Sequence, residues 1–291
     1  MKPQEYLDEV LKSQTLSGDS EEIKALQIKR AEVQGVLEKQ YGTTPTIRYG
    51  GSNAKGTMIR ESFDLDIICY FGSDDTSAGD TLKEIYNNVK EVLAKKYFVE
   101  PKKSALRLLS NEKVDFHVDV VPGRFTDENN SDAFLFQATG EKERLRTNLQ
   151  KHIDYVKTSK LTNTIKLVKY WKILKGLQIT TFALELLVIE SLEGYSDDKG
   201  LDKCLAKLFD KLANDIDNIK IEDPANPQGN DLSELFNSTI KGSVSLAASN
   251  SLVSINDDKW EDVFGSIITR ENAFSTLPTI HRSTPAKPWA R

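Results

Sequence analysis

One segment, residues 50–71, restricts the fold of this 291-residue chain more than any other. It opens with a glycine-rich turn at 50–52 and continues into an apolar run, 63–71, that contains Asp64 and Asp66. Side chains two residues apart in a strand project to the same face, so the two carboxylates are expected to lie side by side. Like charges held this close are unfavourable unless a cation lies between them. The segment therefore predicts a strand that presents two carboxylates to Mg²⁺ or Mn²⁺, which prefer oxygen ligands.

Each part of this segment also has a plainer interpretation. An Asp-x-Asp pair can be a solvated surface pair at a strand end, and two adjacent glycines can simply form a tight turn. The combination favours a ligand site, because the backbone N–H groups of the turn and the Ser52 hydroxyl can receive phosphate oxygens. We therefore interpret residues 50–71 as a site for a phosphate-bearing ligand and a divalent metal ion.

A second acidic strand is expected at 114–121. Asp115, His117 and Asp119 alternate with apolar residues there and would share one face of the strand. If this strand lies beside 63–71, Asp115 or Asp119 would complete a cluster of three carboxylates able to hold two metal ions. The spacing does not choose between them. His117 is interpreted as a hydrogen-bonded edge residue and not as a metal ligand.

The hydrophobic pattern predicts a sheet region in the first half of the chain. A helix is expected to start at a cap formed by Asp19 or Ser20 and to end at Gly42. A second helix opens with a capping box at Thr81 and Glu84. Between and after them we predict strands at 46–49, 63–71, 105–109 and 114–121, the last two paired as an antiparallel hairpin around Ser110-Asn111-Glu112.

The pattern becomes helical from about Glu141 onward. Helices are predicted at 141–157, 162–175, 181–193, 200–213, 231–248 and 257–268. Within the second of these, Ile165, Val168, Trp171 and Leu174 form a stripe typical of a core, with Trp171 as a packing anchor between two lobes.

Composition and charge exclude several classes of protein. The 39 Lys and Arg residues against 44 Asp and Glu give a net charge of −5, which argues against a protein that coats long nucleic acid. The chain lacks both an apolar run of membrane-spanning length and a signal peptide, so we expect a cytoplasmic protein without a membrane partner. Cys69 and Cys204 lie in apolar stretches, which predicts buried thiols and no disulfide.

A series of short motifs resembles the DNA polymerase β-like nucleotidyltransferase superfamily and, within it, the oligoadenylate synthetase and cGAS/DncV-like branch, the CD-NTases. The resemblance runs from about residue 20 to residue 250. The motifs are Gly50-Gly51-Ser52, Gly56-Thr57, Asp64-Leu65-Asp66, Asp119-Val120-Val121-Pro122, Lys166-Leu167-Val168-Lys169-Tyr170-Trp171-Lys172, Phe182-Ala183-Leu184-Glu185-Leu186-Leu187 and Asp223-Pro224-Ala225-Asn226-Pro227.

This resemblance implies an α+β fold. A polymerase β-like nucleotidyltransferase lobe with a mixed sheet would be followed by a helical C-terminal lobe, with the active site in the cleft between them. The corresponding divisions are an N-terminal helical segment bracing the lobes (1–42), the catalytic lobe (43–157), the helical lobe (158–275) and an extended C-terminal tail (276–291).

The resemblance also implies roles for individual residues. The carboxylates that bind two Mg²⁺ ions in the family, with Mn²⁺ as a substitute, correspond to Asp64, Asp66 and Asp119, which leaves Asp115 a structural role. The expected nucleotide-binding residues are Gly51 and Ser52 in the turn, Lys169 at the triphosphate, and Thr181 and Phe182 where the family usually has Ser-Tyr. Phe182 can stack on a base but cannot donate a hydrogen bond, so a core role is an alternative for it. The chain also departs from the family where Phe63 separates Ser62 from Asp64.

The expected function is that of a Mg²⁺-dependent nucleotidyltransferase. It would join nucleoside triphosphates, ATP and others, into a cyclic or linear oligonucleotide second messenger and release pyrophosphate. In bacterial anti-phage signalling a separate effector protein binds such a product. Two alternatives are an enzyme that extends RNA ends, of the CCA-adding or poly(A) type, and a catalytically silent module that senses nucleotides. We expect no stable binding of nucleic acid, although lysines cluster at Lys90, Lys95, Lys96, Lys102 and Lys103.

Overall fold

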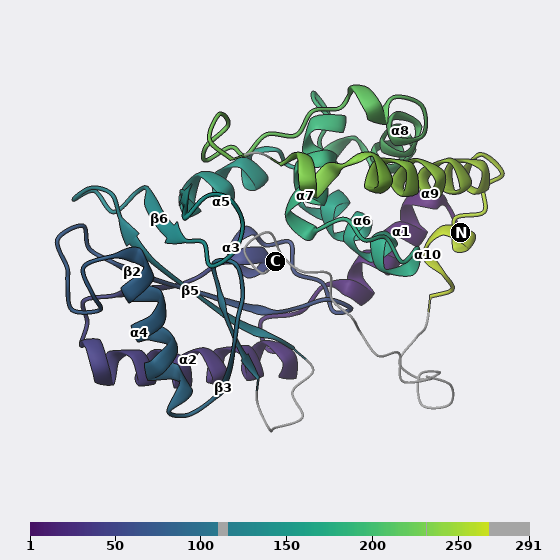
Figure 1. Cartoon of the computed structure of the whole chain (residues 1–291). Coiled ribbons are helices and arrows are strands. Elements are labelled where there is room, and N and C mark those ends of the chain that lie inside the picture. The colour runs from purple at the N-terminus through teal and green to yellow at the C-terminus, as the bar shows by residue number, and fades with distance from the viewer. Residues whose placement is uncertain (110–115, 231, 268–291) are drawn as a thin grey trace.

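The computed structural model describes residues 1–109, 116–230 and 232–267. It contains a mixed sheet with helices on one of its faces, followed by a bundle of helices (Figure 1). The α+β fold class expected from the sequence is confirmed. We refer to α2 through β7 as the sheet half, and to α1 together with α5 and the later helices as the helical half. The α-helices are α1 Pro3–Gln14, α2 Glu21–Tyr41, α3 Gly51–Lys55, α4 Leu82–Ala94, α5 Leu149–Thr158, α6 Thr162–Leu174, α7 Thr181–Ser191, α8 Leu201–Asn214, α9 Ser238–Asn256 and α10 Glu261–Phe264.

The sheet has the strand order β1-β2-β5-β4-β3, and β6 and β7 extend it from the end of β5. Only the β2–β5 pair is parallel among the described strands; the other pairs are antiparallel. The short 3₁₀ helices of the helical half lie at Asp197–Lys199, Ile216–Asn218 and Ser233–Phe236. The strands are β1 Thr46–Tyr49, β2 Leu65–Phe71, β3 Phe98–Pro101, β4 Leu106–Leu109, β5 Val118–Phe125, β6 Ala133–Phe136 and β7 Arg144–Thr147.

The two faces of the sheet have different neighbours. Leu65 and Ile67 of β2 pack with apolar side chains of α2 and α4 in one hydrophobic cluster. The alternate residues Ile68 and Tyr70 point to the opposite face and pack with β5, β6 and the start of α5 in a smaller cluster. Asp66 precedes Ile68 on that second face. The alternation of β2 therefore places the acidic side chains away from α2 and α4.

A separate hydrophobic cluster holds the helical half together. Trp171 is fully buried in it, packs at 41° against Phe209 with ring centroids 5.0 Å apart, and donates from Nε1 to Ser251. The prediction that Trp171 lies between two lobes is therefore wrong, because it is buried in the cluster of the helical half, where it contacts Phe209 of α8 and Ser251 of α9. Leu174, expected in the same core stripe, lies at the end of α6 and is 44% exposed.

The two N-terminal helices contribute to different halves. Tyr6, Leu7 and Val10 of α1 belong to the helical cluster, whereas Leu26 and Val33 of α2 belong to the sheet cluster. The segment between α1 and α2 therefore crosses from one half to the other.

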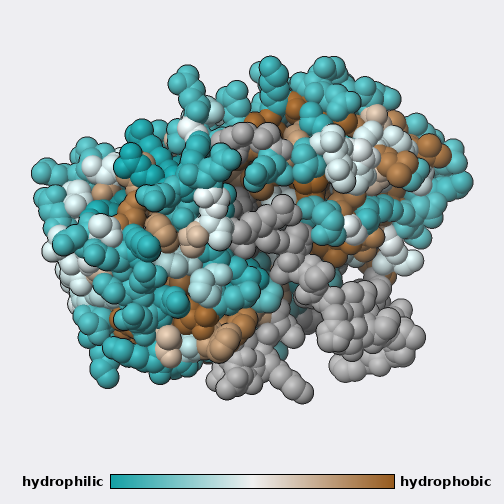
Figure 2. Space-filling view, viewed as in Figure 1, coloured by the Kyte–Doolittle hydropathy of each residue, from teal (hydrophilic) through white to brown (hydrophobic). Residues whose placement is uncertain are grey.

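The prominent apolar side chains on the surface of α9 are Leu246 and Val253, each 65% exposed, while the visible face of the sheet half is mostly hydrophilic (Figure 2).

Local capping signals were predicted correctly. Ser20 caps α2 by accepting from the Ile23 N–H, and Gly42 ends the helix with φ +66°. Thr81 and Glu84 form the expected capping box of α4. Cys69 and Cys204 are buried free thiols, as predicted. The pairing of β4 with β5 confirms the expected hairpin, while its centre at Ser110-Asn111-Glu112, together with Asp115, lies outside the described residues.

Four predicted elements differ from the structure. Of the helix expected at 257–268, the described residues form only α10, Glu261–Phe264. The helix expected at 141–157 begins only at Leu149, because 144–147 pair with β6 as strand β7 and Asn148 then caps α5. The helix expected at 231–248 is α9, which starts later because Asn237 caps it. The strand expected at 114–121 runs on to Phe125, since its last residues pair with β6. The predicted tail, 276–291, lies outside the described residues. None of the described helices is both long and apolar enough to span a membrane.

Candidate active site

The sheet brings the predicted carboxylates together on neighbouring strands. In the parallel β2–β5 pair Asp66 lies directly opposite Asp119, and Asp64 immediately precedes β2. All three are buried, with exposed fractions of 8% for Asp64, 1% for Asp66 and none for Asp119. The backbone N–H of His117 donates to Asp64 over 3.4 Å. As the side chains stand, no three His, Cys, Asp or Glu residues in the described ranges are gathered closely enough to hold a metal ion.

Asp119 is held by an arginine that the sequence analysis did not identify. Arg107 of β4 lies opposite Asp119 in the antiparallel ladder and donates from Nε and Nη2 over 2.8 and 2.9 Å. These bonds raise the pKa of Arg107 above its ordinary value although burial opposes the rise. A two-pronged pair of this kind holds a carboxylate in one orientation. The only signal in the sequence for this contact was an arginine inside an otherwise apolar strand. Which residue faces that arginine depends on the register of the β4–β5 pair, which is set by the connection between the two strands.

The glycine turn approaches Asp66 so closely that a side chain has no room. The Gly50 N–H donates to the Asp66 carbonyl over 2.8 Å, and Gly51 follows with φ +54°. A Cβ at Gly51 would lie 1.6 Å from Asp66 Oδ2. Ser52 is the next residue of α3 and is partly exposed. Gly51 is therefore required both by the backbone conformation and by the carboxylate beside it.

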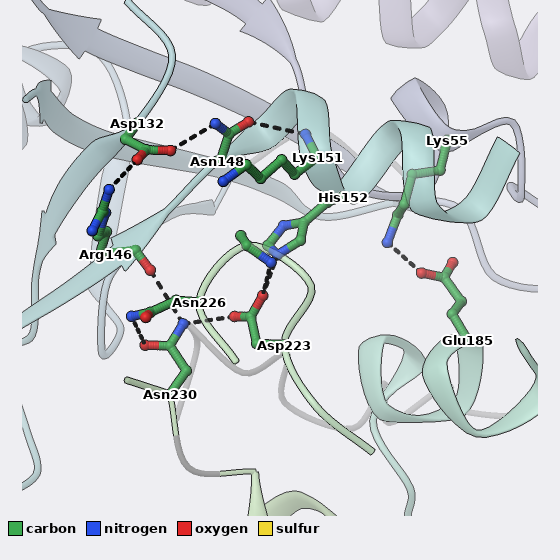
Figure 3. Close-up of polar contacts among 11 residues, drawn as sticks. Lys55, Asp132, Arg146, Asn148, Lys151, His152, Glu185, Asp223, Asn226 and Asn230 are labelled. Atoms are coloured by element: carbon green, nitrogen blue, oxygen red, sulfur yellow. Dashed lines mark hydrogen bonds and ion pairs between the residues drawn. The ribbon is translucent and has the colours of Figure 1, made fainter. Parts of the chain in front are cut away.

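Lys169, expected at a triphosphate, is buried at the junction of the two halves. Its Nζ donates to the Thr57 carbonyl over 2.6 Å, and only 3% of the residue is exposed. The hydroxyl of the same Thr57 donates to Glu185 of α7 over 2.6 Å, and Lys55 of α3 forms an ion pair with Glu185 (Figure 3). Lys169 and Lys55 therefore join α6 and α7 to the segment that carries the glycine turn.

Glu185 is the buried anion of this network. Burial raises the pKa of its carboxyl, but the charges and hydrogen bonds of Lys55, Lys169 and Thr57 outweigh burial and hold the pKa below its ordinary value. Lys172 lies one turn after Lys169 and is also buried. Burial lowers the pKa of Lys172 to about 8, although the negative charges of Glu185 and Asp64 raise it. The sequence motifs contained both Lys172 and Glu185 without indicating that their charges interact.

The two predicted residues of α7 have different surroundings. Thr181 is the first residue of the helix, and the capping hydroxyl belongs to Thr180. Phe182 is 9% exposed and packs with Leu186 and Leu232. Its ring centroid lies 5.3 Å from that of His152 and 5.9 Å from Lys55 Nζ. Phe182 is therefore packed against apolar side chains, as the alternative core role would require, and it also borders the polar groups of His152 and Lys55.

Comparison with known proteins identifies the fold. No protein-family profile and no curated protein matches the chain. Solved structures match over most of its length. E. coli MS115-1 CdnC, solved as a CdnC:HORMA-deltaN complex, is 18% identical with a TM-score of 0.71, covering 91% of this chain and 98% of that chain. The CdnE cyclic dinucleotide synthase of Elizabethkingia meningoseptica, solved with GTP and Apcpp, is 14% identical with a TM-score of 0.65, covering 88% and 99%.

A third match is the Vibrio cholerae DncV cyclic AMP-GMP synthase, solved with a linear intermediate. It is 15% identical with a TM-score of 0.58, covering 92% of this chain and 87% of that chain. Each of these proteins is a CD-NTase, and the likeness extends over both halves of the structure. The chain described here has the cGAS/DncV-like CD-NTase fold.

Proposed function

We propose that the protein is a nucleotidyltransferase that joins nucleoside triphosphates into a cyclic or linear oligonucleotide. The observation that carries this proposal is the placement of Asp66 opposite Asp119 on adjacent parallel strands, with Asp64 two residues before Asp66 and Gly51 against the Asp66 carboxylate. In a CD-NTase fold this arrangement combines acidic side chains that can bind metal with a glycine turn whose backbone N–H groups can receive a phosphate. The reaction would take place between the sheet half and the helical half.

The charges of the site fit a divalent metal ion. Asp64, Asp66 and Asp119 supply hard oxygen donors of the kind that Mg²⁺ and Mn²⁺ prefer. Arg107 pairs with Asp119 and Lys172 interacts electrostatically with Asp64, and these two positive charges leave the three carboxylates with a net negative charge. A carboxylate retains free lone pairs even when an arginine binds both its oxygens, so Asp119 can serve Arg107 and a metal ion together. When bound, Mg²⁺ would polarise the α-phosphate and favour deprotonation of the attacking hydroxyl.

The residues of this chain have separable roles in the proposed reaction. Asp64 and Asp66 anchor the metal ions, and Gly51 and Ser52 receive the triphosphate. Asp119 also anchors metal, and a lone pair that Arg107 leaves free on its carboxylate can accept the proton of the attacking hydroxyl. The helical half supplies three further contacts to the nucleotide. Lys169 exchanges its hydrogen bond to the Thr57 carbonyl for one to a phosphate oxygen. Thr181 places its hydroxyl near a phosphate, and Phe182 borders the base.

The proposed substrates are ATP and other nucleoside triphosphates. Support comes from structural neighbours solved with nucleotides, including CdnC with ATP and the Bradyrhizobium diazoefficiens CdnG with GTP. The product would be a second messenger bound by a separate effector protein, as in bacterial anti-phage signalling. This part of the proposal rests on the fold and on the sequence motifs.

The test is synthesis from labelled nucleotides. Purified protein is incubated with Mg²⁺ or Mn²⁺ and with ATP, GTP, CTP and UTP singly and in pairs, followed by phosphatase and a nuclease that cleaves linear 3′–5′ links. A resistant, compact product supports cyclisation, and a phosphatase-sensitive product indicates a linear chain. The matched control is the same protein with Asp64→Asn and Asp66→Asn. Absence of any product from all pairs, or equal product from the control, would contradict the proposal.

A further inference from the structure

A buried carboxylate in the helical half lies at the centre of a polar cluster (Figure 3). Asp223 is 4% exposed and belongs to the loop 222–230. Its oxygens accept from Nε2 of His152 over 2.7 Å, from Nδ2 of Asn230 over 2.6 Å and from the Ala225 N–H over 2.8 Å. Burial raises the pKa of Asp223, but the hydrogen bond and charge of His152, with the bonds from Asn230 and Ala225, outweigh burial and hold it below its ordinary value.

The same loop binds the segment where the chain leaves the sheet for the helices. Asn230 Nδ2 also donates to the Arg146 carbonyl of β7 over 3.1 Å, and Lys142 Nζ donates to the Gly229 carbonyl over 2.7 Å. His152 lies one turn inside α5, the first helix after β7. Loop 222–230 is therefore attached to residues 142–152 by side chains from both partners. A carboxylate that satisfies three donors at one point holds these elements in a single arrangement.

His152 carries this arrangement toward the candidate active site. With Nε2 held by Asp223, its ring packs at 58° against Phe182 of α7. The Nζ of Lys55 lies 5.9 Å from the Phe182 ring centroid and pairs with Glu185, one turn further along α7. Lys55 is the last residue of α3, the helix that begins at Gly51. A continuous series of contacts therefore leads from Asp223 through His152, Phe182 and Lys55 to the glycine turn.

We propose that Asp223 and His152 are positioning residues for nucleotide binding. Asp223 orients the His152 ring, which fixes Phe182 and, through it, the side chain of Lys55 at the end of α3, the helix that begins at the glycine turn. The inference rests on the proposed function, because it assigns these contacts to the nucleotide site. Neither residue touches the reacting atoms, so their loss weakens nucleotide binding and leaves the chemical step nearly unchanged.

The steady-state test separates positioning from a general loss of structure. Asp223→Asn and His152→Ala are expected to raise KM for the nucleoside triphosphate about tenfold, the scale of one lost hydrogen bond to a charged group, with kcat within about twofold. His152→Gln keeps a side-chain amide that can donate to Asp223, and it should restore most of the loss. Lys142→Met is the matched control, because it removes another contact of the same loop without touching His152, and its KM should match the wild type.

Hydrogen exchange of the nucleotide-free protein gives a second readout that does not require activity. Faster exchange in Asp223→Asn is expected at the start of α5 and at 51–57, with β3 and β4 unchanged. Exchange that rises only within 222–230, or a KM equal to the wild type in an active Asp223→Asn protein, would overturn the inference. If the wild type makes no product, the proposed function fails, and exchange at 51–57 then decides the positioning by itself. Equal KM changes in Lys142→Met would also contradict it, because the loop would then act only as a structural support.

Discussion

Replacing Arg107 with methionine tests whether the buried cation holds the acidic cluster together in the absence of metal. Asp119 is fully buried and Arg107 only 11% exposed, and two hydrogen bonds join them. Removing one member of a buried ion pair costs about 3 to 5 kcal/mol, because the remaining charge has lost its partner. Arg107 retains some exposure, so we expect Arg107→Met to lower the free energy of unfolding by about 3 kcal/mol, at the lower end of this range.

The assay is urea unfolding followed by circular dichroism, in EDTA and again with Mg²⁺. Adding Asp119→Asn to Arg107→Met should recover most of the loss, because an asparagine leaves no buried charge to stabilise. Mg²⁺ should also recover part of it, since a metal ion then supplies the missing positive charge. Arg146→Met is the matched control: its partner is Asp132, Arg146 is 51% exposed, and the loss should stay below about 1 kcal/mol. A loss under about 1 kcal/mol in Arg107→Met, or no recovery in the double variant, would refute the reasoning.

Further predictions concern other charges of the site and its turn. Asp64→Asn combined with Asp66→Asn should abolish product formation while thermal melting without metal stays equal or rises, because repulsion between the carboxylates is removed; a large fall in melting temperature would show that the pair is structural. The Lys172 ammonium has a pKa of about 8 in the folded protein and 10.5 in the unfolded chain. Between pH 8 and pH 10.5 the unfolded chain therefore binds more protons, so the free energy of unfolding should rise with pH across that range by about 3 kcal/mol. Chemical unfolding of wild type and Lys172→Met across that range isolates this rise as their difference, and parallel curves would contradict it. Gly51→Ala should lose activity and several degrees of melting temperature, because its Cβ would overlap Asp66 Oδ2, whereas Gly18→Ala, with no neighbour within 4 Å of its Cβ, should melt like the wild type. Product synthesis should not need nucleic acid, because the chain carries no surplus of positive charge. A large, salt-sensitive stimulation of synthesis by duplex DNA or RNA would overturn this prediction if the stimulation is lost when five lysines are changed to glutamate: Lys90, Lys95, Lys96, Lys102 and Lys103.

Local signals in the sequence predicted the elements that depend on neighbouring residues. The cap at Ser20 and the capping box at Thr81 each follow from interactions within a few residues along the chain. The alternation of polar and apolar residues likewise predicted which face of β2 carries the acidic residues. The same local rules failed at 144–147, where a helical pattern was expected, because pairing with β6 decides the conformation of that segment.

The candidate site shows the same division. The order of its motifs indicated that Asp64, Asp66 and Asp119 act together, and the β2–β5 register places the last two opposite each other. Their charge partners were not predictable in this way. Arg107 meets Asp119 only because of the register of an antiparallel pair, and that register depends on a connection whose conformation the motifs do not specify.

The sequence by itself indicated the fold class and the local helix and strand signals and singled out the candidate acidic residues, because these inferences depend on periodicity, caps and the order of motifs. Only the tertiary structure decided which cation faces which anion. Lys55 and Glu185 are 130 residues apart in the chain, and His152 and Asp223 are 71 apart. Such pairs form when separate elements pack, and burial then makes each charge depend on its partner, since an unpaired buried charge is too costly to retain.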